Sequence, residues 1–185
     1  GSTCEFHSPD PAVRRKQVEI GKQFVDLAHD TGAWGVKVRP NAFPKEVSRE
    51  TTIQNIGTSL RELGAYAQGR GIEIWLEVHG RETSEPAACA AMMRAANHPS
   101  VGLCWNSNEP DVIGGSVKQN FNLLRPWIKH VHINELVSGY PYRELFRLLK
   151  EAKYDCYTLA ELPENPQAVR FLKYYKALWT ELCRA

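Results

Sequence analysis

The chain has 185 residues, of which 43% are hydrophobic and 24% are charged, and its formal net charge is +2. That length suffices for one domain with a substantial core. A nearly neutral charge with no run of lysine or arginine argues against binding to nucleic acids or membrane surfaces. No apolar run reaches the roughly 18 residues that cross a bilayer. The five cysteines are scattered without C-x-x-C spacing, which favours buried free thiols in a reducing, cytoplasmic compartment over a disulfide framework.

Short apolar segments alternate with longer amphipathic segments along the chain. The predicted strands, in chain order, are Ser2–His7, Gly35–Arg39, Ile72–His79, Val101–Asn106, His130–Asn134 and Tyr157–Glu161. The predicted helices are Pro11–Thr31, Arg49–Gly69, Glu85–Asn97, Ser116–Ile128, Tyr142–Ala152 and Pro166–Cys183. No linker interrupts the alternation, so residues 1–185 are predicted to form a single domain. Six strand–helix units in strict alternation predict parallel strands joined by right-handed crossovers.

The pattern within the strands distinguishes a doubly wound sheet from a barrel. Central strands of a doubly wound sheet are covered by helices on both faces and read as continuous apolar runs. Here polar and apolar residues alternate: in Ile72–His79 one face is apolar and the other carries Glu73, Trp75, Glu77 and His79. Polar residues also gather toward the carboxyl ends of the strands, where barrel enzymes carry their chemistry. The sequence therefore predicts an α/β fold of the (β/α) TIM-barrel type.

The number of units predicts an incomplete barrel. A complete barrel has eight units and about 250 residues, whereas this chain shows six units and begins in a strand. We therefore expect the first two units to be missing, which leaves the strands that would be third to eighth. Such a barrel has two unpaired sheet edges, which favours association into a homo-oligomer. The missing units also predict weak or absent catalysis by this chain alone.

Four predicted strand ends carry a side chain that can bind a metal, namely Glu77, Asn106, His132 and Glu161. Oxygen and imidazole ligands suit Mn²⁺, Mg²⁺, Co²⁺ or Zn²⁺. Any one of these residues alone is more commonly a solvated carboxylate or a hydrogen-bonded structural group. Because the four occur at equivalent positions of four successive strands, we expect them to share one cavity with a divalent metal.

Four segments resemble, in their order and spacing, the fifth to eighth strand motifs of the xylose isomerase-like barrel superfamily. They are Leu76–Gly80, Val101–Asn106, His130–Asn134 and Leu159–Glu161, and the resemblance extends from Ser2 to Leu182. The superfamily contains sugar phosphate isomerases and epimerases. The resemblance therefore implies an isomerase or epimerase of carbohydrate metabolism that acts on a sugar or a sugar phosphate.

The resemblance also implies roles for individual residues. Glu77, Asn106, His132 and Glu161 correspond to the metal ligands of the family, and the two glutamates correspond to its acid/base pair. In the implied reaction, the metal stabilises an enediolate while the two glutamates remove and return a proton. The residues expected to contact the substrate at the same rim are His79, Arg39, His7, Lys37, Asn108, Glu109, Asn134 and Glu135.

One residue departs from the family pattern. The family usually has aspartate at the sixth-strand ligand, whereas this chain has Asn106, whose amide oxygen can bind a metal but brings no charge. We therefore expect weaker metal binding than in the family. For Lys37 and Arg39, ion pairs with Glu5 or Glu73 are the alternative to substrate contact.

Two other functions compete with the isomerase hypothesis. The asparagine at the metal position and the missing units favour a sugar-binding barrel domain with impaired catalysis. An endonuclease IV-like phosphodiesterase has the same barrel, but its zinc cluster needs many histidine ligands. This chain has six histidines, of which His29 and His98 fall on or beside helices, and it has no basic surface pattern.

Overall fold

The computed structural model describes residues 1–184, and within them a parallel sheet is covered on its outer face by helices. Its five strands pair in the order β1-β2-β3-β4-β5, and every neighbouring pair is parallel. The strands are β1 (Gly35–Val38), β2 (Glu73–Glu77), β3 (Val101–Trp105), β4 (Ile128–Ile133) and β5 (Thr158–Ala160). The helices are α1 (Pro11–Asp30), α2 (Arg49–Gln68), α3 (Pro86–Ala96), α4 (Lys118–Leu124), α5 (Tyr142–Glu151) and α6 (Ala168–Leu182). Two 3-10 turns, Glu109–Asp111 and Arg125–Trp127, complete the described elements.

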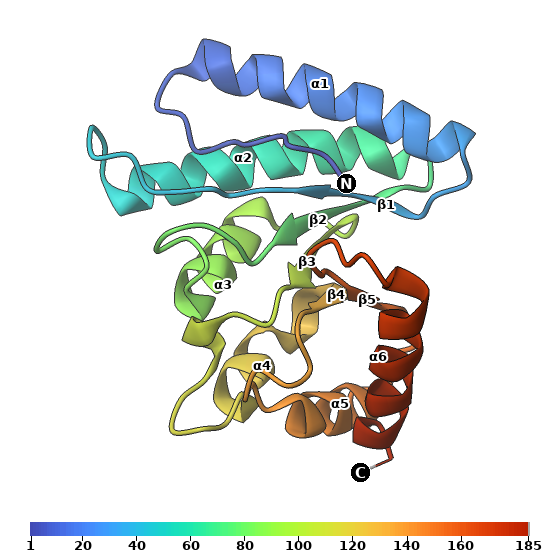
Figure 1. The fold of residues 1–185 in the computed structure, drawn as a ribbon. Coiled ribbons are helices and arrows are strands. Elements are labelled where there is room, and N and C mark those ends of the chain that lie inside the picture. The colour runs from blue at the N-terminus through green and yellow to red at the C-terminus, as the bar shows by residue number, and fades with distance from the viewer. Residues whose placement is uncertain (185) are drawn as a thin grey trace.

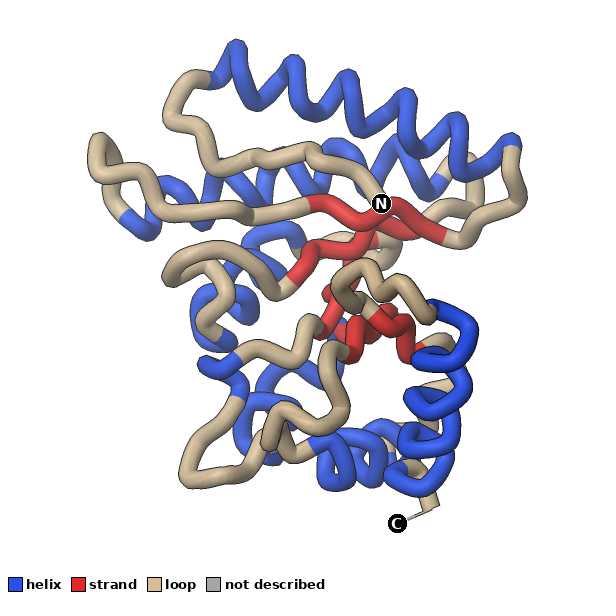
Figure 2. The backbone as a smooth tube through the Cα atoms, viewed as in Figure 1, coloured by secondary structure: helices blue, strands red, loops and turns tan. Residues whose placement is uncertain are grey.

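The arrangement confirms the predicted α/β barrel architecture in partial form. Figure 1 shows the helices following one another around the outside of a strongly twisted sheet, from α1 and α2 beside β1 to α6 beside β4 and β5. The tube in Figure 2 shows the strands gathered at the centre with helices on several sides. None of the described helices is long and apolar enough to cross a membrane.

The first predicted strand, Ser2–His7, is wrong as a strand. The segment lies beside β1, but only one bridge, between Glu5 and Arg39, joins the two. The Ser2 hydroxyl interrupts the pairing because it accepts a hydrogen bond from the Cys4 amide (3.4 Å) and donates one to the Lys37 carbonyl (2.6 Å). A local side-chain bond thus replaces a backbone bond that a regular ladder would contain.

Capping residues set the starts of the two longest helices. Asp10 accepts a hydrogen bond from the Ala12 amide at the start of α1, and Ser48 accepts one from the Thr51 amide at the start of α2. Both residues satisfy amide groups that have no carbonyl partner in the first helical turn. The two helices therefore begin close to where the sequence predicts.

The predicted helix over 116–128 is shorter in the structure. The α-helix α4 ends at Leu124, a 3-10 turn follows, and β4 begins at Ile128. Pro126 lies in that turn. Because proline has no amide hydrogen and its ring clashes with the preceding turn, the α-helix cannot continue through it.

The alternation within the strands takes the form that the sequence predicts. The apolar residues of β1 and β2, such as Val38, Ile74 and Leu76, are fully buried beneath the helices. They pack in one core with residues of α2 that include Leu60 and Leu63. Of the polar residues on the opposite, inward face, Lys37 and Glu73 are half-buried and Glu77 is buried.

All five cysteines are free thiols, but two of them are not buried. Cys4, Cys89 and Cys104 are buried as predicted, whereas Cys156 is exposed and Cys183 is partly exposed. The prediction is wrong for these two because Cys156 lies just before the edge strand β5 and Cys183 directly follows α6. None of the described residues of α6, the helix on this side of the sheet, is buried.

Close packing of Gly80 against Asn41 holds the loop after β2 in place. Gly80 has a φ of +89°, and a Cβ atom there would lie 1.5 Å from the carbonyl oxygen of Asn41, so only glycine fits. The Thr83 hydroxyl lies within hydrogen-bond distance of the Asn41 carbonyl (2.6 Å) and the His79 carbonyl (2.9 Å). The loop after β2 is thereby held against the loop after β1.

Candidate metal centre

Two carboxylates and an imidazole meet at the carboxyl ends of three strands. Glu77 is the last residue of β2, His132 lies in β4 and Glu161 directly follows β5. One ligand atom from each of these side chains lies within 4.8 Å of the others. The Nδ1 atom of His132 is 3.5 Å from Glu77 Oε1 and 3.5 Å from Glu161 Oε2. The imidazole therefore stands between the two carboxylates.

Asn106 supplies a further oxygen that lacks a partner. It directly follows β3, the strand between β2 and β4, and its side chain is buried. Among the described residues, neither Asn106 Oδ1 nor His132 Nδ1 has a hydrogen-bond partner. Leaving a buried polar atom unpaired costs about 1–3 kcal/mol. A set of oxygen ligands with one imidazole fits a hard or borderline divalent cation, which would satisfy both atoms.

Two cations hold Glu77 in its ionised form. Its side chain is 2% exposed, with Lys37 Nζ 2.8 Å and Arg39 Nε 3.5 Å from the same oxygen, Oε2. Burial opposes ionisation, but the nearby His132 and Lys37 outweigh it and lower the pKa of Glu77 to about 2. Glu77 is therefore a fixed negative charge at the base of the site.

The alternative ion pairs considered from the sequence do not form. Lys37 and Arg39 pair with Glu77 rather than with Glu5 or Glu73. Glu5 accepts a hydrogen bond from the Asn41 side chain (2.9 Å). Glu73 accepts one from the Trp75 ring (2.9 Å) and lies 3.2 Å from the Lys129 ammonium group.

Glu161 is much freer than Glu77. Its side chain is 54% exposed, and its only ion-pair contact within the described residues is with His132. It lines a cavity of about 490 Å³ at the same rim. The polar and aromatic residues that share this lining are Ser107, Glu109, Asn134, Glu135, Ser138, Tyr140 and Tyr142.

The other residues predicted to contact a substrate are placed differently. His79 lies near enough to Glu77 to favour its charge, and its buried Nδ1 has no partner among the described residues. His7 is farther out, with Nδ1 3.9 Å from Glu5. The side-chain amide of Asn108 donates a hydrogen bond to the Val78 carbonyl and so holds the loop after β3, while its contact with a substrate stays a prediction.

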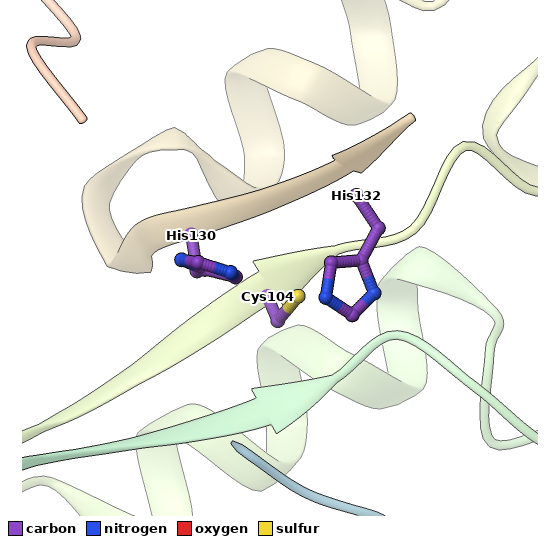
Figure 3. Close-up of side chains that lie close together, drawn as sticks. All are labelled: Cys104, His130 and His132. Carbon is purple, nitrogen blue, oxygen red and sulfur yellow. The ribbon is translucent and has the colours of Figure 1, made fainter. Parts of the chain in front are cut away.

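The sequence reasoning missed a second group of potential ligands, shown in Figure 3. Cys104 of β3 and His130 and His132 of β4 offer ligand atoms within 4.8 Å of one another. Cys104 and His130 each lie two residues before a predicted ligand, so strand parity was the signal that could have identified them.

A buried acid next to the rim was also missed. Asp111 is fully buried and accepts hydrogen bonds from the backbone amide of Asn108 (2.6 Å) and the Tyr140 hydroxyl (3.1 Å). Burial outweighs these bonds and raises the pKa of Asp111 to about 7. Nothing in the sequence pattern distinguished this aspartate from a solvated loop residue.

Comparisons with known proteins agree with this architecture. The chain is similar to a D-tagatose 3-epimerase-like protein, with a TM-score of 0.83, 19% identity, and coverage of 100% of this chain and 76% of that chain. It is also similar to 3-keto-D-glucoside 4-epimerase from E. coli, with a TM-score of 0.81, 17% identity, and coverage of 97% and 76%. A third match is a xylose isomerase-like TIM barrel protein from Mycobacterium smegmatis in complex with magnesium, with a TM-score of 0.67, 19% identity, and coverage of 95% and 69%.

These identities establish the fold and leave the activity to be tested. No curated protein matches the chain at a significant level. A family model, described as the xylose isomerase-like TIM barrel, matches residues 2–177. Because that match spans nearly the whole sequence, the resemblance seen in the strand motifs is confirmed, and the chain belongs to the xylose isomerase-like TIM barrel family.

Proposed function

We propose that the chain functions as a metal-dependent isomerase or epimerase. It would act on a sugar or sugar phosphate by proton transfer next to a carbonyl group. One observation carries the proposal: Glu77, His132 and Glu161 present their ligand atoms within 4.8 Å of one another at the carboxyl ends of their strands. The sugar epimerases among the matched structures and the magnesium bound to a third support the same class of chemistry.

The metal site would comprise Glu77, Asn106, His132 and Glu161. Their three oxygen-bearing side chains and one imidazole suit Mn²⁺ or Mg²⁺, and Co²⁺ or Zn²⁺ fit the same set. A cation bound there supplies positive charge for the negative charge that develops on substrate oxygens. Asn106 adds no charge, so the site binds the cation less tightly than one with a third carboxylate.

The two glutamates divide the proton transfer between them. Glu161 is exposed beside the cavity, so its carboxylate can approach the carbon that loses the proton. Glu77 lies on the other side of His132 and is oriented by Lys37 at 2.8 Å. A carboxylate on each side of the substrate can remove and return a proton on opposite faces. Arg39 is 35% exposed and can also donate to a substrate oxygen.

The test measures metal binding and proton exchange separately. Free Mn²⁺ is followed by electron paramagnetic resonance during titration of chelator-treated protein. The Mn²⁺ complex is then incubated with D-tagatose, D-fructose or their phosphates in D₂O, and deuterium entering the carbon next to the carbonyl is followed by NMR. We expect Glu161→Gln to weaken Mn²⁺ binding by at least about tenfold and to slow exchange by about 10²–10⁴-fold.

The matched control is Glu164→Gln, which removes an exposed glutamate three residues away. This variant should bind Mn²⁺ and exchange deuterium like the parent protein. Exchange that is equally fast in the Glu161→Gln variant would overturn the proposal.

The sugar-binding alternative rests on a specific contact. The Lys37 ammonium group already pairs with Oε2 of Glu77, so this carboxylate has less negative charge to offer a metal. A barrel that binds sugars without catalysis would show sugar binding by calorimetry together with no Mn²⁺ uptake and no deuterium exchange.

A further inference from the structure

The Cys104, His130 and His132 group has the geometry of a metal site distinct from the rim set. Cys104 and His130 are register partners on the adjacent strands β3 and β4, so their side chains leave the sheet side by side. Figure 3 shows both histidines projecting from β4 toward the Cys104 sulfur. Cys104 and His130 lie one inward position back along their strands from the rim residues Asn106 and His132, and His132 belongs to both groups.

The distances between the ligand atoms of these three side chains are close to those between the ligands of a bound ion. Their ligand atoms lie within 4.8 Å of one another. Zinc-type bond lengths to sulfur and nitrogen place neighbouring ligands of a tetrahedral ion roughly 3.3–3.8 Å apart. Side-chain movements of about 1 Å would therefore close the group around an ion, and its fourth position would remain free for water.

The surroundings hold the group in place. The His130 ring stacks on Trp75, with ring centroids 4.4 Å apart and planes 7° apart. The Cys104 sulfur is fully buried, and its one hydrogen-bond contact is a long one, 3.7 Å to the Trp105 carbonyl. His130 also lines a cavity of about 680 Å³ at the amino ends of β1, β4 and β5, which offers a path for an ion.

We propose that Cys104, His130 and His132 form a second metal site, selective for thiophilic ions such as Zn²⁺ or Cd²⁺, which competes with the rim site for His132. A thiolate with two imidazoles favours soft ions, whereas the oxygen-rich rim set favours Mn²⁺ or Mg²⁺. The thiol proton is released to solvent when the ion binds.

Competition follows from the chemistry of one imidazole. Nδ1 of His132 faces Glu77 and Glu161, and Figure 3 shows a ring nitrogen on the side of Cys104. A neutral imidazole has one lone-pair nitrogen and one N–H nitrogen, so it binds one metal at a time. An ion at the lower site therefore removes the imidazole from the rim site. This part of the inference rests on the proposed rim metal, whereas the existence of the lower site does not.

The test uses Cd²⁺ and Co²⁺ on the chelator-treated protein. Their thiolate complexes absorb in the near ultraviolet, which reports on the lower site without any assay of activity. We expect one equivalent of each ion to produce the band in the parent protein and in Glu161→Gln. The band should be lost in Cys104→Ser and in His130→Gln, with folding checked by circular dichroism.

The control variant is Cys156→Ser, which removes the exposed thiol and should keep the band. With Mn²⁺ bound at the rim, one equivalent of Cd²⁺ should release it from the parent protein, whereas Cys104→Ser should need at least about tenfold more Cd²⁺. A band that persists in Cys104→Ser, or disappears in Cys156→Ser, overturns the second site. A normal band in a protein that does not bind Mn²⁺ supports the lower site and overturns the competition together with the proposed rim metal.

Discussion

The two glutamates of the rim site lie on an interior strand and beside an edge strand of the same sheet, in opposite environments. Glu77 belongs to β2, beneath α2 and α3, and its side chain is 2% exposed with Lys37 bound to it. Glu161 follows the edge strand β5, and its side chain is 54% exposed. The neighbouring helices differ in the same way, because α2 buries eight residues whereas none of the described residues of α6 is fully buried.

In the proposed function, this difference in environment would give the two carboxylates different tasks. A carboxylate that is buried and paired has a fixed position, so in the proposed reaction Glu77 would stay aimed at one face of the substrate. A carboxylate that is half exposed can change its rotamer at little cost, which suits a group that must approach and leave a carbon atom. The packing of the sheet therefore gives one side of the site rigidity and the other side freedom.

The largest effect is expected from breaking the buried pair. Glu77→Gln leaves the Lys37 ammonium group, 12% exposed, without its carboxylate partner. Removing one member of a buried ion pair costs about 3–5 kcal/mol, so we expect a loss of that size in the free energy of unfolding of metal-free protein. Urea denaturation measures it.

Two further variants are measured together with Glu77→Gln. Glu161→Gln removes an exposed carboxylate and should change stability by less than about 0.5 kcal/mol. Adding Lys37→Met to Glu77→Gln removes the unpaired charge and should recover much of the loss. Equal losses of stability in Glu77→Gln and Glu161→Gln would show that the buried and the exposed carboxylate do not differ in their environments.

The next effect compares leucines on the two sides of the sheet. Leu63 of α2 is fully buried, whereas Leu172 of α6 is 50% exposed. Leu63→Ala should destabilise the protein by about 2–5 kcal/mol, because it leaves a cavity in the core. Leu172→Ala should cost less than about 0.5 kcal/mol. The same denaturation experiment applies, and a large cost at Leu172 would mean that another copy of the chain covers α6 in solution.

The rim site follows from parity and could be anticipated from the sequence. In parallel strands, every second residue shares a face, so polar residues at the ends of β2, β4 and β5 must lie at one edge. This rule brought Glu77, His132 and Glu161 together before any coordinates. The same rule, applied two residues earlier, leads to Cys104 and His130.

Other features depend on contacts that no periodic pattern encodes. The Ser2 hydroxyl replaces a backbone bond and removes a predicted strand. The side-chain amide of Asn108 donates a hydrogen bond to the Val78 carbonyl at the end of the neighbouring strand. Lys37 pairs with a glutamate on a neighbouring strand, which requires the twist of the sheet as well as its register. Each of these outcomes is decided by one side chain.

The last prediction concerns how stability depends on pH through Asp111, a buried acid near the rim cavity. Its pKa is raised to about 7 by burial, while an unfolded chain has an aspartate pKa of about 3.9. Between these values the unfolded state has released the proton and the folded state still holds it. The contribution of Asp111 to stability should therefore be full below about pH 4, fall by at most about 1.4 kcal/mol per pH unit, and level off above about pH 7. Urea denaturation across this range measures the slope.

Asp111→Asn tests whether that slope belongs to this residue. Asparagine keeps an oxygen that can accept the Asn108 and Tyr140 hydrogen bonds and has no proton to release in this range. The variant should therefore lose the fall in stability between about pH 4 and pH 7.

The contrast between Asp111 and Glu77 is informative, because the two buried acids differ in their partners. Two cations lie against Glu77, whereas an amide and a hydroxyl contact Asp111, so burial alone decides the direction for Asp111. An unchanged slope in Asp111→Asn would assign the titration to another group and remove this contrast.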